Sequence, residues 1–283
     1  MNEDDRFGLH GARRYCNGPN LQWPEQWPAT NGRNPDRRIT TMRFLDDGAP
    51  PHELTYNDVF MVPSLSGVPS RLDVDLATPD AIGTTLPIVV ANMTAVAGKR
   101  MAETVARRGA LAILPQDIPL DIVERNVRYV KSRHLVYDTA ITLGPTDTVQ
   151  QALSLVYKRA HGAVIVVEEG APIGIFTEVD AEGFDRFSQL HTVMSSQLVS
   201  FRARTPVEDM YEQLTEARLS CAPVVDDGRL VGVITRKGAL RAELYRPAVD
   251  EAGRLMVGTA LGINGDVATK AKTVADFGID LIV

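Results

Sequence analysis

The sequence contains few cysteines and no long apolar run, and each of these absences excludes a class of protein. Only two cysteines, Cys16 and Cys221, occur among 283 residues, so no disulfide framework is available and we expect a reducing, cytoplasmic location. No apolar run approaches the roughly 20 residues that a membrane-spanning helix needs, and no basic segment followed by an apolar one suggests a signal peptide. The net charge of −6 argues against a nucleic-acid partner.

Several motifs for bound groups are also missing. The five histidines are scattered, and the chain contains neither the HExxH nor the CxxC spacing, so we expect no zinc site. No G-x-x-x-x-G-K-[ST] loop is present, which argues against a P-loop nucleotidase. With 44% hydrophobic and 23% charged residues, the composition is that of an ordinary globular chain long enough for two domains.

The most informative feature is an internal repeat. The segment ITLGPTDTVQQALSLVYKRAHGAVIVVEEGAPIGIFT (141–177) aligns without a gap on VSFRARTPVEDMYEQLTEARLSCAPVVDDGRLVGVIT (199–235), which lies 58 positions further on. Apolar positions coincide along both copies. Each copy predicts a short strand, an amphipathic helix (in the first copy from about residue 149, capped by Thr146 or Asp147) and a hairpin with a glycine in its turn.

Each copy resembles a CBS domain, and the pair resembles the tandem arrangement called a Bateman module. In that family the motif G-h-h-T-x-x-D, with h apolar, holds the phosphate and ribose of an adenine or guanine nucleotide. The first copy has the complete motif at 174–180, whereas the second has Gly238 in place of the aspartate. The resemblance implies four nucleotide-binding residues: Thr177, Asp180, Thr235 and Lys237. Alternatively, the threonine and aspartate of the first copy only cap the short helix that follows.

The segments that flank the repeat alternate between strand and helix patterns, which is typical of a parallel sheet. We expect strands at 86–93 (buried on both faces), 110–114, 254–261 and 280–283, and helices at 98–108, 120–130 and 266–277. Residues 1–41 lack such a pattern and are rich in Asn, Arg, Pro and Gly. Two interpretations are open. These residues form a disordered N-terminal arm that docks through its tryptophans, or translation truly begins at Met42 and the start of the sequence is set wrongly.

Three segments, LTYNDVFMVPS, LPIVVANM and MVGTALG, occur in this order with the repeat before the last. Together they resemble the IMP dehydrogenase / GMP reductase family, in which a (β/α)8 TIM barrel carries a CBS pair inserted after its second helix. The resemblance implies that this α/β chain contains about the first four barrel strands and ends before the rest. The implied domains are barrel parts at 42–134 and 243–283, with CBS domains at 135–188 and 189–242.

The resemblance also implies a substrate site in the loop after the first barrel strand, where the family contacts the purine base. That loop holds Ala91, Asn92 and Met93, and barrel enzymes carry their active sites at such strand ends. Ala-Asn-Met is the reductase version of the loop, but Thr94 replaces the aspartate usual in both branches. The alternative for Met93 is plain core filling.

Two further expectations concern the chemistry of the barrel. Gln116 and Asp117 end the second strand and are weaker candidates for the substrate site. The family attacks C2 of the purine with a cysteine thiolate from the later half of the barrel, but Cys221 falls in a predicted buried strand and Cys16 in the arm. We therefore expect no catalytic residue in this chain.

The activity that the resemblance implies is that of a purine-nucleotide oxidoreductase, in first place an NADPH-dependent GMP reductase, which converts GMP to IMP and ammonia. The alternative within the family is NAD-dependent IMP dehydrogenase, which converts IMP to XMP. The alternative of another class is a non-catalytic module that senses adenine or guanine nucleotides. The family further implies regulatory ATP or GTP at the CBS domains, a monovalent cation such as K+ in the remaining half, and homotetramers or octamers.

Overall fold

The computed structural model describes residues 53–61, 65, 67–78, 80 and 82–283, so the expected arm and the alternative start at Met42 lie outside the described residues. The chain divides into two compact units, Met1–Asp75 and Leu76–Val283. The first unit includes two short 3-10 helices, η2 (Tyr56–Asp58) and η3 (Arg71–Asp73). Thr55 begins η2 with a capping box, because its hydroxyl oxygen accepts the N–H of Asn57 and its backbone N–H donates to the Asp58 carboxylate.

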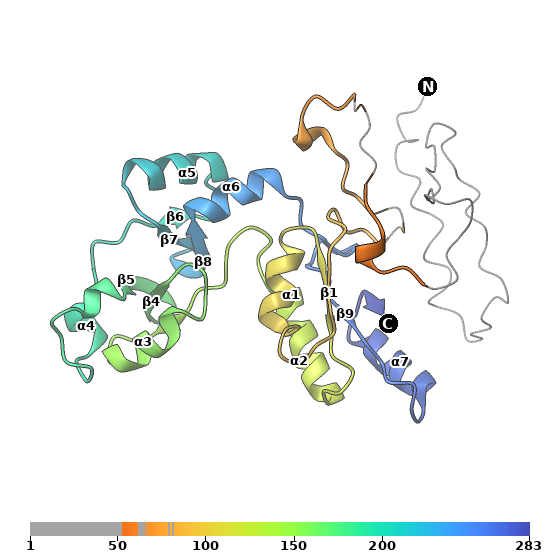
Figure 1. Ribbon diagram of the computed structural model, residues 1–283. Helices are drawn as coiled ribbons and strands as arrows, with labels where there is room; N and C mark the ends of the chain where they lie inside the picture. Colours follow the sequence, from red (N-terminus) through yellow and green to blue (C-terminus); the bar gives the residue numbers. More distant parts are fainter. Residues whose placement is uncertain (1–52, 62–64, 66, 79, 81) are drawn as a thin grey trace, which may run out of the picture. The chain divides into compact units, whose positions relative to one another are not determined.

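The second unit contains a four-stranded sheet whose strands are all parallel. Its order is β1 (Val89–Val90), β2 (Leu111–Leu114), β9 (Gly258–Thr259) and β10 (Leu281–Ile282), as Figure 1 shows in part. Strand β2 precedes the repeat and β9 follows it, yet they are direct neighbours, with Ile113 opposite Gly258. The predicted parallel alternation is confirmed, and the repeat interrupts it between two adjacent strands.

Three helices pack on one face of this sheet: α1 (Lys99–Ala106), α2 (Leu120–Lys131) and α7 (Val267–Asp276). Because side chains alternate along a strand, Ala112 and Leu114 join the core beneath these helices, whereas Leu111 and Ile113 join a second cluster with Met256 on the opposite face. The expected helices at 98–108, 120–130 and 266–277 are therefore confirmed, each within a few residues of its predicted ends.

The expectation that 86–93 is a strand buried on both faces is wrong. Only two of its residues pair as β1, and the Ile88 and Val89 side chains are 54% and 59% exposed. The reason is that β1 lies at the end of the sheet and pairs with β2 alone. The expected strand at 254–261 is likewise reduced to two paired residues, although residues 255–260 are all buried.

A buried lysine holds α2 to the chain that returns after the repeat. The Lys131 ammonium lies 2.9 Å from Asp250 and 2.7 Å from Asp280, and Asp280 also accepts the N–H of Val257. Burial alone would raise the pKa of Asp250, but hydrogen bonds from Arg254 and Lys131 outweigh burial and lower the pKa to about 2. For Asp280 burial prevails and its pKa is raised. This ionic contact therefore holds α2 to the segment that leads into β9, the first strand of the parallel sheet after the repeat.

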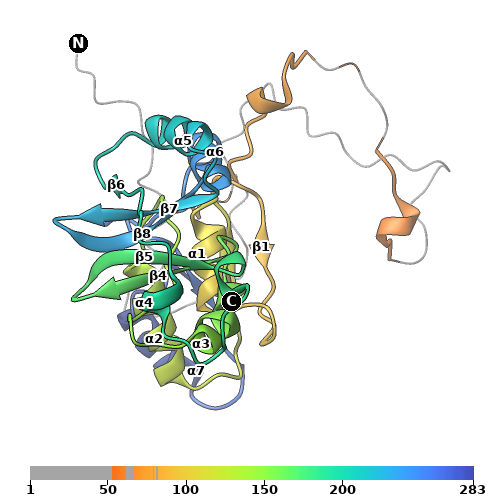
Figure 2. The same ribbon diagram turned by 90° about the vertical axis from the view of Figure 1, so that its left-hand side faces the viewer.

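The internal repeat is a repeat of structure as well as of sequence (Figure 2). Each copy forms a three-stranded sheet, in which the first strand pairs parallel and the hairpin pairs antiparallel. The first copy consists of β3 (Thr142–Leu143), α3 (Val149–Val156), β4 (Ala163–Glu168) and β5 (Ala171–Thr177). The second consists of β6 (Phe201–Arg202), α5 (Val207–Glu216), β7 (Cys221–Asp226) and β8 (Arg229–Thr235).

Both hairpins close with the same tight turn, as predicted. The central residues have positive φ in both copies, 51° and 89° at Glu169 and Gly170, and 46° and 76° at Asp227 and Gly228. The predicted cap of the first helix is wrong by one or two residues, since Thr148 caps α3 in a capping box with Gln151. The alternative, Asp147, instead accepts the N–H of Gly144.

Each sheet is extended by a segment that precedes the other copy. Asp138, ahead of the first copy, forms an antiparallel bridge with Val233 of the second, and Ser195, ahead of the second, does the same with Ile175 of the first. A core cluster of Ala163, Ile165, Cys221 and Val233 joins the two sheets. Because each copy completes the other, we expect the two copies to fold as one body.

Candidate functional site

The loops that follow the parallel strands carry a group of accessible polar side chains. Ala91, Asn92 and Met93 follow β1 directly and are exposed, with Met93 at 58%. A tight turn shapes this loop, because the N–H of Met93 donates to the carbonyl of Ala91 and the Met93 carbonyl accepts two further N–H groups before α1 begins. The structure therefore places the three predicted substrate residues at the carboxyl end of a parallel strand, where ligands of such sheets bind.

Thr94 and Asp117 meet across the ends of β1 and β2. The Thr94 hydroxyl lies 3.1 and 3.3 Å from the two carboxylate oxygens of Asp117. Sequence reasoning took Thr94 as the loss of a carboxylate from this loop, but the structure supplies one from the neighbouring loop. The sequence could have indicated this contact, because both residues are polar and both lie just after neighbouring parallel strands.

The third loop of this group follows β9. A Cβ added to Gly262 would lie 3.7 Å from the side-chain oxygen of Gln116, so Gln116 is next to that loop. The polar side chains that these loops carry are two amides, one hydroxyl and one carboxylate, from Asn92, Gln116, Thr94 and Asp117. Such groups can donate to and accept from the edge of a nitrogen heterocycle, and the exposed Met93 can cover its face.

In the first copy of the repeat, Thr177 and Asp180 bond to each other. The backbone N–H and the hydroxyl of Thr177 both donate to one oxygen of Asp180, at 2.7 Å each. The 3-10 helix η4 (Val179–Ala181) follows, but its N-cap residue is Glu178 and no side chain forms a cap hydrogen bond, so the capping alternative is wrong for this pair. The second carboxylate oxygen of Asp180 makes neither of these two bonds.

The second copy uses its threonine differently. Thr235 caps α6 (Arg236–Leu244) by accepting the N–H of Gly238 at 2.8 Å, and Lys237 is exposed on the first turn of this helix. The structure thus brings Thr177 and Asp180 together, but it joins Thr235 to the backbone of Gly238 and not to Lys237.

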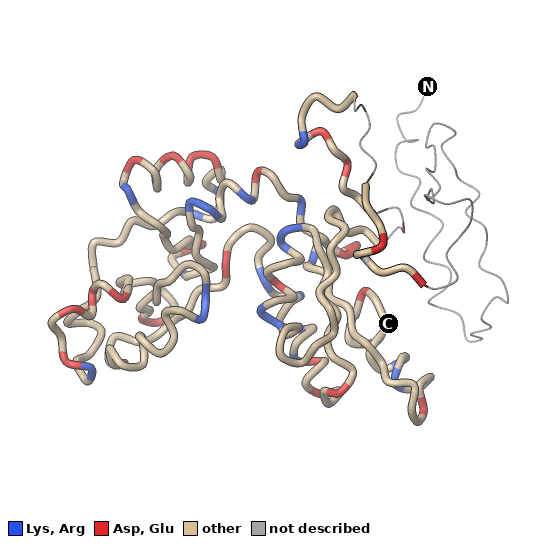
Figure 3. The backbone as a smooth tube through the Cα atoms, viewed as in Figure 1, with Lys and Arg blue, Asp and Glu red and all other residues tan. Residues whose placement is uncertain are grey.

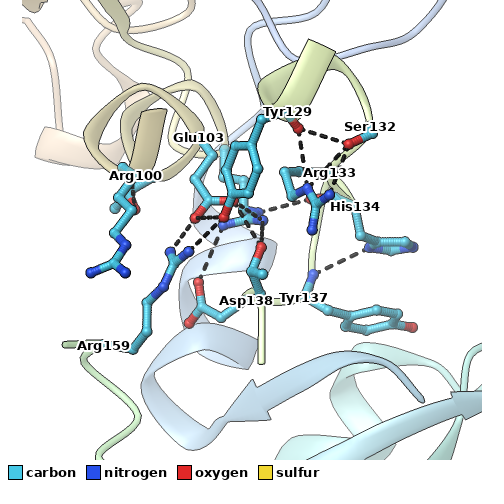
Figure 4. Close-up of polar contacts among 12 residues, drawn as sticks. Arg100, Glu103, Tyr129, Ser132, Arg133, His134, Tyr137, Asp138 and Arg159 are labelled. Carbon is cyan, nitrogen blue, oxygen red and sulfur yellow. Dashed lines mark hydrogen bonds and ion pairs between the residues drawn. The ribbon is translucent and has the colours of Figure 1, made fainter. Parts of the chain in front are cut away.

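A buried ionic cluster connects α1 to the segment that leads into the repeat (Figure 4). Glu103 on α1 is fully buried, and its carboxylate accepts hydrogen bonds from four side chains. These donors are Arg107, Tyr129, Thr139 and Arg159. Sequence reasoning missed this cluster, because a glutamate four residues before an arginine is most simply a solvated pair.

The described part of the chain contains no exposed thiol and no cluster of metal-ligating side chains. Cys221 is 5% exposed in β7, and burial raises the pKa of its thiol, so it is a poor nucleophile. Cys16 lies outside the described residues. Residues 53–61, 65, 67–78, 80 and 82–283 contain no group of three metal-ligating side chains, and no helix among them has the length and apolar character to cross a membrane.

Comparison with known proteins gives a consistent result. Residues 53–283 match the family described as the IMP dehydrogenase / GMP reductase domain. GMP reductase of Mycobacterium tuberculosis is 52% identical over 243 residues, which cover 86% of this chain and 51% of that protein. Inosine-5'-monophosphate dehydrogenase of Staphylococcus aureus is 30% identical over 238 residues, 81% of this chain and 49% of that protein.

Solved structures agree with the sequence relatives. The crystal structure of GMP reductase from Trypanosoma brucei in complex with guanosine 5'-triphosphate matches with a TM-score of 0.55 and 26% identity, over 83% of this chain and 59% of that one. A cysteine-to-alanine variant of that enzyme in complex with guanosine 5'-monophosphate matches with a TM-score of 0.54 and 26% identity, over 83% of this chain and 52% of that one. The chain spans about half the length of the curated relatives it matches.

Proposed function

Because this chain belongs to the IMP dehydrogenase / GMP reductase family, we propose that it is part of a GMP reductase, an oxidoreductase that converts GMP to IMP and ammonia. The observation that carries the proposal is the 52% identity to a GMP reductase, against 30% to an IMP dehydrogenase. The loop Ala91-Asn92-Met93 supports the same branch. The alternatives are an IMP dehydrogenase and a nucleotide-sensing module without catalysis.

In the proposed reaction the 2-amino group of GMP takes up a proton and leaves as ammonia, and a hydride, which NADPH would supply, takes its place at C2 of the purine. The role of this chain is to hold the base: Asn92 and the Thr94–Asp117 pair face its polar edge, and Met93 covers its ring. These neutral and acidic groups do not suit the 2'-phosphate of NADPH, so we assign no residue here to the cofactor. The described residues also contain no accessible thiol, and the nucleophile is therefore not assigned to them.

The experiment is a pair of assays on the protein translated from the complete reading frame that contains this sequence. We expect GMP-dependent oxidation of NADPH with release of ammonia, and no turnover of IMP with NAD. Asn92→Ala should lower kcat/KM by about tenfold or more, as expected when a polar contact to the base is lost. Gln150→Ala, an exposed change on α3, is the matched control and should have no effect.

Each other outcome has a definite meaning. Turnover of IMP with NAD alone would make the protein a dehydrogenase. A folded protein that turns over neither substrate pair would contradict the enzymatic proposal and leave the sensing module. Equal losses in Asn92→Ala and Gln150→Ala would remove the base-binding role of the loop after β1.

We also propose that the repeat at 141–235 is a CBS pair that binds regulatory ATP or GTP. The first copy is the better candidate because it keeps the full motif, with Asp180 held against Thr177 and one oxygen not engaged in that pair. The similarity to a GMP reductase crystallised with guanosine 5'-triphosphate supports this proposal. Assembly as a homotetramer or octamer and a cytoplasmic location remain proposals on the family resemblance, and sedimentation would test the first.

A further inference from the structure

A cavity of about 70 Å³ lies where the end of α1, the segment 135–138 and α6 come together. Three arginines contribute to its lining, Arg107 and Arg108 from the end of α1 and Arg241 from α6. Figure 3 marks the basic positions on both helices. Among the described residues that line the cavity, Asp138 is the only carboxylate.

Arg107 is already engaged with neighbouring groups. Its guanidinium donates to Glu103 at 3.2 Å, to Asp138 at 3.5 Å and to the carbonyl of His134 at 2.8 Å. The carboxylate of the cavity is therefore shared with Arg107. Asp138 also raises the pKa of Arg108, so one negative charge is shared among the arginines of the cavity.

Arg108 and Arg241 take part in none of the salt bridges found among the described residues. Burial, and next the positive charge of Arg241, lower the pKa of Arg108, and the opposite effects of Asp138 and Tyr245 do not outweigh them. Each lies near the end of a helix, where a cation is favourable, but this preference does not explain why both line one cavity.

We propose that this cavity binds a phosphate group between Arg108 and Arg241. A guanidinium offers paired donors that match phosphate oxygens, and an anion here would remove the repulsion between the two arginines. One water needs about 10–15 Å³ of such space, so the cavity accommodates a group of about five heavy atoms and not a whole nucleoside. The ligand is thus inorganic phosphate, or the phosphoryl end of a nucleotide whose remainder lies outside.

The site does not depend on the nucleotide-binding motif of the repeat. Thr177, Asp180 and Thr235 are not among the lining residues, and Gly238 contributes no side chain. A phosphate held here would bridge α1, which precedes the repeat, and α6, which ends it. Binding would therefore stabilise the junction between the repeat and the parallel sheet.

Isothermal titration of the full chain with inorganic phosphate, in chloride buffer of constant ionic strength, tests the proposal. We expect wild-type protein to bind phosphate, and Arg108→Gln and Arg241→Gln each to bind about ten- to a hundredfold more weakly. Arg204→Gln is the matched control, since Arg204 is exposed and does not line the cavity. Circular dichroism in chloride buffer confirms that every variant is folded.

A nucleoside 5'-monophosphate titrated in parallel identifies the source of the phosphate. Tighter binding with the same dependence on both arginines indicates the phosphoryl end of a nucleotide, and equal or weaker binding indicates free phosphate. Asp180→Ala should leave phosphate affinity unchanged, which separates this site from the proposed CBS site. The proposal is overturned if wild-type protein does not bind phosphate, or if Arg108→Gln and Arg241→Gln bind it as tightly as wild type.

Discussion

The two copies of the repeat share one backbone and differ at their polar positions. Both have the same strand order, the same turn and a bulge at the same place, between Val166 and Val167 and between Val224 and Val225. Yet the aspartate of the first motif is Gly238 in the second copy. Positions that make the fold are thus repeated, whereas positions that could hold a ligand have diverged.

The copies also differ in how they attach to the rest of the chain. Arg159 of the first copy bonds to buried Glu103 on α1, but the corresponding residue of the second copy is Ala217. His161, also buried, corresponds to Leu219. Within the described part of the chain, a buried ion pair ties the first copy and not the second to α1, while α6, which follows the second copy, meets α1 at the arginine-lined cavity. Two copies of one fold thus differ in a few polar residues that decide how each is attached.

The largest effect should come from breaking the attachment of the first copy. Glu103→Ala removes the acceptor of four hydrogen bonds and leaves Arg107 and Arg159 without their shared buried carboxylate, which should lower the free energy of unfolding by about 3–5 kcal/mol. Glu124→Ala is the matched control, because Glu124 forms an exposed i,i+4 pair with Arg128 and should cost no more than about 0.5 kcal/mol. Urea denaturation measures both, and equal costs would show that the attachment contributes nothing.

The next effect tests the difference between the two motifs. If the first copy binds ATP or GTP, a ligand at a hundred times its Kd should stabilise the protein by about 2.7 kcal/mol, and Asp180→Ala should remove this gain. Asp226→Ala, an exposed carboxylate of the second hairpin, should keep it. Thermal denaturation with and without nucleotide gives the answer, and a gain that survives Asp180→Ala would place the ligand elsewhere.

The smallest effect concerns pH. His161 is neutral in the fold, since Nδ1 accepts the N–H of Ala163 and Nε2 lies 3.4 Å from the carbonyl of Thr139. Burial lowers its pKa below the ordinary 6.5, so the unfolded chain binds more protons and stability falls as pH drops below about 6.5.

One such proton changes the free energy of unfolding by at most about 1.4 kcal/mol per pH unit. His161→Leu, which copies the residue of the second repeat, should therefore flatten the dependence of stability on pH below about 6.5. The exposed His191→Leu should not change it. An unchanged slope in His161→Leu would mean that other groups set the acid response.

By itself, the sequence determined the parallel alternation, the repeat and its hairpin turns, because these depend on local periodicity and on the glycines at positive φ. It also placed Ala91, Asn92 and Met93 at a strand end. Only the tertiary structure decided that β1 is exposed, because the strand pattern does not say how many neighbours a strand has. The Thr94–Asp117 contact and the burial of Glu103 likewise needed the fold, since charge and polarity are visible in a sequence but the distance between remote residues is not.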